Sequence, residues 1–189
     1  MNIFKHKLML TALVLSAVLW STVASADNIY LRYIYKDIKG DVTDPGYEDT
    51  IGIDSFSWGL SRPVSFVVGG GGGAGAAESA EVVLTKLLDS SSTKLAVEAL
   101  IGKGEAVKIE FAQTGGPGLQ TYMELELCNA YVTSLSTTSG GERPSEDLGL
   151  VFEAFKLTYT SFDLQGIPGS PVDTGWWSFS TNSPGGGPC

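Results

Sequence analysis

The chain has 189 residues, of which 43% are hydrophobic and 17% are charged, and its formal net charge is −9. This composition excludes a disordered protein, and the length suits one domain. The acidic balance argues against a basic phosphate-binding surface, so nucleic acid is not an expected partner.

The first 26 residues differ from the rest. A positive start at Lys5 and Lys7 precedes an apolar run at 8–20 and the small-residue sequence Ala24-Ser25-Ala26. The run is short for a bilayer, and together these features predict a secretory signal peptide cleaved after Ala26. An uncleaved membrane anchor is the alternative. We therefore expect a signal peptide at 1–26, a folded domain at 27–182 and a flexible tail at 183–189, in a secreted or periplasmic protein that has no membrane segment after cleavage.

Cleavage would also remove His6, which is the only histidine, and leave a net charge of −11. A chain without imidazole cannot form a Ser-His-Asp triad, a Cys-His pair or an H-E-x-x-H zinc site. We therefore predict no enzyme activity of these classes.

Strand patterns dominate the first half of the mature chain. Residues 28–36 alternate in polarity, and a polar loop follows at 37–49. A second strand pattern, at 50–61, slips phase once near Ser55, as a bulge would produce. The glycine run Gly69–Gly73 predicts a loop, because glycine loses much conformational entropy in a strand or helix.

One helix is predicted within residues 87–101. Ser90, Ser91 and Ser92 are candidate N-caps, and Gly102 is a natural C-terminal stop. An apolar stripe for packing would consist of Leu95, Ala96, Ala99 and Leu100.

Four further strands are expected, at residues 106–113, 119–136, 148–163 and 175–179. Within 119–136, Met123, Leu125 and Leu127 share one face. The fold class is therefore mostly β, an antiparallel β-barrel or two-sheet sandwich with one short α-helix.

Sites for chemistry are weakly indicated. The glycine run lacks the lysine of a P-loop, and the carboxylates at 37–49 lack EF-hand spacing, so a solvated turn is preferred to a calcium site. Carboxylate pairs for glycoside hydrolysis stay open among Glu110, Glu124, Glu126 and Glu153, although their alternation with apolar residues favours solvent-facing positions. We predict no catalytic residue, no metal and no cofactor.

Aromatic residues at strand positions suggest either a sugar-binding platform or, as we prefer, core and interface packing. These residues are Trp58, Trp176, Trp177, Tyr122 and Tyr131. The two cysteines, Cys128 and Cys189, allow a disulfide within an exported chain, a link between two chains, or free thiols.

Three motifs occur in order: SFSWGLS at 55–61, GGGGGAGAAE, and Leu84-Thr85-Lys86. Together they resemble the haemolysin-coregulated protein (Hcp) family of type VI secretion systems. The stretch SGGERPSEDLGLVFEAFKLTYT, and Gly175-Trp176 with Asn182, extend the resemblance over about residues 29–182.

The resemblance implies a non-enzymatic β-barrel protein whose homo-hexameric rings stack into the inner tube of the apparatus, with spike, sheath and effector proteins as partners. It also implies that the glycine loop reaches a neighbouring ring or subunit. The interface candidates are then Gly69, Gly70, Gly71, Gly72, Gly73, Ala74 and Gly75. The signal peptide supports an alternative hypothesis, an exported Hcp-like binding protein without a tube role. An exported hydrolase is the weakest hypothesis.

Overall fold

The computed structural model describes residues 27–66, 68–115, 118–163, 166–169, 173–185 and 189. The predicted signal peptide lies outside these residues. In the part of the chain that is described, no helix is both long enough and apolar enough to cross a membrane.

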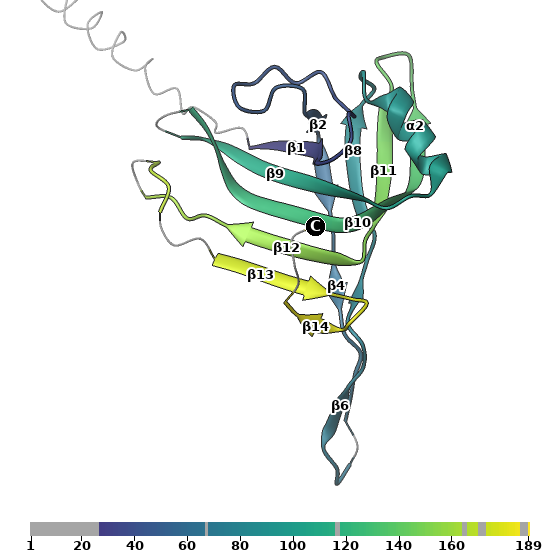
Figure 1. The fold of residues 1–189 in the computed structure, drawn as a ribbon, viewed down its shortest axis with the longest axis vertical. Helices are drawn as coiled ribbons and strands as arrows, with labels where there is room; N and C mark the ends of the chain where they lie inside the picture. Colours follow the sequence, from purple (N-terminus) through teal and green to yellow (C-terminus); the bar gives the residue numbers. More distant parts are fainter. Residues whose placement is uncertain (1–26, 67, 116–117, 164–165, 170–172, 186–188) are drawn as a thin grey trace, which may run out of the picture.

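Two antiparallel layers form a sandwich (Figure 1). The first layer has the strand order β2-β1-β9-β10-β12-β13-β14. Its bounds are β1 (Asn28–Tyr33), β2 (Ile51–Ile53), β9 (Glu105–Gly115), β10 (Gly118–Thr138), β12 (Ala154–Tyr159), β13 (Asp173–Ser178) and β14 (Ser183–Pro184). The second layer contains the end of β10 followed by β11 (Ser145–Val151), β8 (Val82–Leu87) and β3 (Ser55–Ser57).

Strand β10 and the segment from β2 to β3 each pass from one layer to the other. The 21-residue strand β10 pairs with β9 and β12 along its first part and with β11 from Tyr131 onward, with a register shift near Val132. On the other side, Asp54 alone separates β2 from β3. The phase slip near Ser55 is therefore not a bulge within one strand, as predicted, but the point where the chain leaves the first layer for the second.

The core lies between the layers and is built from alternate residues of their strands. Leu31, Ile109, Leu125 and Leu127 come from the first layer, and Leu84, Leu148 and Leu150 come from the second. All seven are essentially inaccessible to solvent. This alternation is what a sheet with one buried face requires.

Helix α2 (Ser92–Ile101) packs against β10, and Gly102 ends it in the left-handed conformation, at φ +64°. The predicted apolar stripe of α2 is confirmed at two of its four residues. Leu95 is buried and Ala99 is half-buried, but Ala96 is exposed and Leu100 is 88% exposed. Ser91, one of the three predicted candidates, is the N-cap residue, but its side chain makes no capping bond. The carboxylate of Asp89 instead accepts from the backbone N–H of Ser91 at 3.0 Å.

Two other strand predictions need correction. The single strand expected at 148–163 is divided into β11 and β12, because Phe152 and Glu153 turn the chain from one layer to the other. The tail expected to be flexible from residue 183 begins as β14, which pairs with Trp177 and Ser178 of β13. Mostly β architecture, in the form of a two-sheet sandwich with one short helix, is confirmed.

Candidate assembly surface

A β-ribbon projects from the sandwich, and we call residues 59–80 the arm. The pair β4 (Leu60–Ser61) and β7 (Glu78–Ser79) forms its base, and the pair β5 (Val64–Phe66) and β6 (Gly72–Ala74) forms its outer part. Figure 1 shows β6 far from the sandwich, on the side opposite α2. The arm therefore presents most of its surface to solvent.

The outer part of the arm is apolar and uncharged. Residues 63–77 include no acidic or basic side chain, in a protein whose net charge is −9. Phe66 is 85% exposed, and Val64 and Val68 are also exposed. Exposed apolar side chains gathered on one projecting element are typical of a contact surface.

The glycine run is partly a strand, which corrects the prediction of a loop. Gly72, Gly73 and Ala74 form β6, while Gly69–Gly71 make the turn, with Gly69 at φ +84°. A Cβ atom added to Gly72 would lie only 3.1 Å from Cε1 of Phe66. The Phe66 ring thus covers the glycine strand, and this packing compensates in part for the missing side chains.

An open apolar groove lies where the arm meets the sandwich, with a volume of about 400 Å³. Leu60 and Ala77 of the arm form one wall, and Phe155, Trp177 and Phe179 form the other. The groove thus lies at the base of the arm, whereas the interface candidates Gly69–Gly75 lie in its outer part.

The loop at 37–49, which contains the carboxylates considered for a calcium site, folds over the outer face of the first layer. Tyr47 stacks on Tyr30, with ring centroids 4.2 Å apart, and the hydroxyl of Tyr30 donates to Asp44 at 2.5 Å. Burial, together with this bond to a carboxylate, raises the pKa of Tyr30 well above its usual range. Asp49 is paired with Lys39 at 2.9 Å.

Among the residues described, no group of three or more His, Cys, Asp or Glu side chains is arranged to hold a metal ion. Each of the four glutamates considered for glycoside hydrolysis has a polar partner, and two of them share one, because Glu126 lies 3.6 Å from the same Lys108 that Glu124 contacts. Glu110 lies 3.5 Å from Arg32, Glu124 lies 3.0 Å from Lys108, and Glu153 accepts from Asn129 at 3.1 Å. Trp58, Trp177 and Tyr122 pack against the core, as the preferred interpretation of the aromatic residues requires.

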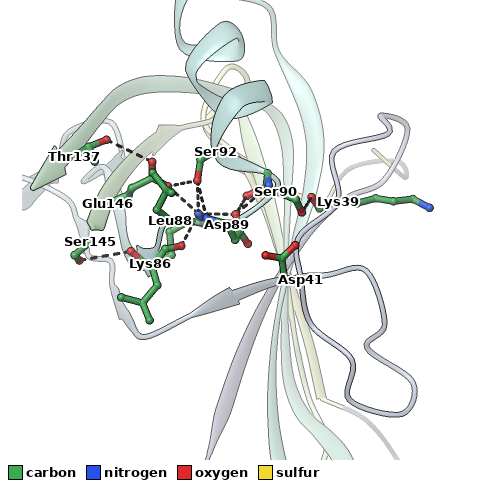
Figure 2. Close-up of polar contacts among 12 residues, drawn as sticks. Lys39, Asp41, Lys86, Leu88, Asp89, Ser90, Ser92, Thr137, Ser145 and Glu146 are labelled. Atoms are coloured by element: carbon green, nitrogen blue, oxygen red, sulfur yellow. Dashed lines mark hydrogen bonds and ion pairs between the residues drawn. The ribbon is translucent and has the colours of Figure 1, made fainter. Parts of the chain in front are cut away.

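Sequence reasoning did not identify a buried polar cluster at the start of α2 (Figure 2). Lys86 is fully buried, and its Nζ lies 2.8 Å from both Glu146 Oε2 and Asp89 Oδ1. The hydroxyl of Ser92 accepts from Lys86 at 3.0 Å and donates to Glu146 at 2.6 Å. The sequence did contain a signal that Lys86 is buried, because Lys86 alternates with Val82 and Leu84, and all three lie on the buried face of β8. The cluster anchors the first turn of α2 to the second layer.

The two cysteines lie together. A disulfide joins Cys128 of β10 to Cys189, with their Cα atoms 5.0 Å apart. The C-terminus is marked in Figure 1 beside β10 and β12. Cys189 thus lies near the middle of the first layer rather than at its edge strand β14. Oxidation in the protein stays a prediction, which thiol counting and non-reducing electrophoresis check.

Structural comparison gives several matches to type VI secretion proteins. A structure described as a type six secretion system protein has a TM-score of 0.77 and 24% identity, and the match covers 85% of this chain and all of the other. Hcp1 from Salmonella typhimurium has a TM-score of 0.67 and 18% identity, over 84% of this chain and 99% of the other. A type VI secretion system effector from Yersinia pestis matches with a TM-score of 0.60 and 15% identity, over 79% and 98%. At these identities the likeness establishes the fold.

No curated protein matches the chain in sequence. A family model described as "Type VI secretion system effector, Hcp" does match, over residues 30–159. This match covers more than half of the chain, from β1 to β12, and it agrees with the resemblance carried by the SFSWG, glycine and Leu-Thr-Lys motifs. The chain therefore belongs to the Hcp family of type VI secretion system effectors.

Proposed function

We propose that the chain is a non-enzymatic, ring-forming subunit of a type VI secretion inner tube, and that its arm makes contacts between subunits. The observation that carries this proposal is the arm itself, in which fifteen consecutive uncharged residues, 63–77, expose Phe66 and Val68. Family membership supplies the apparatus in which such contacts would operate. The assembly would consist of homo-hexameric rings that stack, with spike, sheath and effector proteins as partners.

Light scattering of residues 27–189 tests the proposal. We expect a discrete hexamer at low concentration and larger, stacked species as the concentration rises. The Phe66→Ser/Val68→Ser double variant should keep the folded ring and lose the larger species, because it removes apolar surface that would be buried at the contact. Ile167→Ser, at an exposed apolar residue outside the arm, is the matched control. A protein that stays monomeric at all concentrations would contradict ring formation.

The alternative is an exported Hcp-like binding protein without a tube role. Two features favour it: the signal-peptide pattern of residues 1–26 and the disulfide between Cys128 and Cys189. Disulfides persist mainly in oxidising compartments. Mass spectrometry of protein from periplasmic and culture fractions distinguishes the two, since export by this route gives an N-terminus at Asp27. Intact Met1 with reduced cysteines in the cytoplasm would favour the tube.

A further inference from the structure

The turn between β13 and β14 makes a polar contact with the base of the arm. Asn182 lies in this turn, and its Oδ1 atom accepts a hydrogen bond from Nη2 of Arg62 at 2.9 Å. The same oxygen accepts a second bond, from the backbone N–H of Ala77, at 3.0 Å. Arg62 follows β4 and Ala77 precedes β7, so a single amide oxygen holds both strands of the ribbon.

A stacking contact reinforces this connection. The guanidinium carbon of Arg62 lies 5.2 Å from the ring centroid of Trp177, which belongs to β13. A cation placed over an indole face at this distance is attracted by the ring. Arg62 and Glu78 are the only charged residues in the arm, and both lie at its base. The charge of Arg62 is thus placed where the arm joins the body.

The backbone at Asn182 suits this role. Its φ of +49° is left-handed, which asparagine, aspartate and glycine adopt more readily than other residues. The left-handed turn and the bonding amide therefore occur in one residue. Different substitutions at this residue can test the two properties independently: the left-handed shape of the turn, and the side-chain oxygen that holds the arm.

We propose that Asn182 is a positioning residue that fixes the direction in which the arm leaves the sandwich. The inference rests on the proposed role of the arm in assembly. Outside its base the arm is a two-stranded ribbon, and such ribbons are only marginally ordered alone. Bonds from Asn182 to both strands hold the arm in the orientation in which Phe66 would reach a neighbouring subunit.

The test uses residues 27–189 with two substitutions at one position. Asn182→Gly keeps a residue suited to positive φ and removes the oxygen, whereas Asn182→Asp keeps an acceptor for Arg62 and Ala77. Amide hydrogen exchange is read at single-residue resolution. We expect exchange at Ala77 to rise about tenfold in the glycine variant, since the amide loses its acceptor and the ribbon loses a charge-assisted bond, and to stay near that of the wild type in the aspartate variant. Exchange at Leu125 of the core should be unchanged in both.

Assembly measured on the same samples separates this inference from the proposed function. The glycine variant should stack less than the wild type, and the aspartate variant should restore stacking. Unchanged exchange at Ala77 in the glycine variant would overturn the positioning role, as would equal exchange in the glycine and aspartate variants. If Phe66→Ser/Val68→Ser leaves stacking intact, the role of the arm in assembly fails, and the positioning of the arm is then decided by exchange alone.

Discussion

At the scale of single residues, Lys86 is the buried charge on which the start of α2 depends. Its ammonium group contacts two carboxylates, Glu146 and Asp89, and the hydroxyl of Ser92. Removing one member of such a group leaves the other charges buried without a partner, which destabilises the protein strongly. Replacing the whole group by apolar side chains of similar volume changes stability much less. The cluster is therefore sensitive to the loss of Lys86.

We predict that Lys86→Met lowers the free energy of unfolding by about 3–5 kcal/mol, because Glu146 would stay buried without its cation. Urea unfolding of residues 27–189 measures the change. Lys94→Met is the control, since Lys94 is half-exposed and pairs with the exposed Asp37; its effect should stay within about 1 kcal/mol. Equal effects from the two substitutions would contradict the importance of the buried cluster.

At the scale of elements, α2 depends on contacts at both ends. Its one fully buried apolar side chain is Leu95, and its other buried residues, Ser92 and Glu98, are polar. Glu98 accepts a bond from Lys36 at 2.5 Å. With so little apolar burial, the geometry of the helix ends contributes a large share of its stability.

The C-terminal end of α2 gives the element-scale prediction. Gly102→Ala should destabilise the protein by about 1 kcal/mol, because alanine is strained in the left-handed conformation at φ +64°. Gly140→Ala is a matched control: this glycine has no positive φ, and an added Cβ would meet nothing within 4 Å. Thermal unfolding of both variants checks the difference, which should vanish if the strain is absent.

The sequence predicted local elements better than it predicted pairing partners. Strands β9 and β10 were recognisable because alternate residues such as Leu125 and Leu127 face one core. The break between β11 and β12 was missed, because Phe152 and Glu153 turn at a layer boundary that exists only once β10 pairs with both strands. For the arm, the sequence indicated the turn but not the strand that follows it. Five glycines indicate a turn, but they do not indicate the strand at Gly72, which pairs with Phe66 across the ribbon.

At the scale of the whole molecule, the disulfide connects the end of the chain to the middle of the first layer. It would close a loop of 61 residues that includes β11, β12, β13 and β14. The longer the closed loop, the more conformational freedom the unfolded chain loses. An oxidised protein should therefore be substantially more stable than a reduced one.

We predict that Cys128→Ser/Cys189→Ser lowers the free energy of unfolding by about 4 kcal/mol under oxidising conditions, from the loop-length dependence of disulfide stabilisation. Urea unfolding with and without reductant measures this. In reductant the wild type and the double variant should unfold together, which provides the internal control. A wild type that is insensitive to reductant and contains two free thiols would mean that the pairing does not form.

The absence of charged side chains from residues 63–77, the outer part of the arm, bears on how association would respond to ionic strength. Acidic bodies repel one another, and dissolved ions weaken that repulsion over a distance of about 8 Å at physiological ionic strength. Residues 63–77 themselves contribute no charged side chain to such a contact whose attraction salt could screen. Added salt would therefore relieve the repulsion and leave the attraction in place, so that filaments held by the arm would lengthen in concentrated salt and shorten on dilution into water.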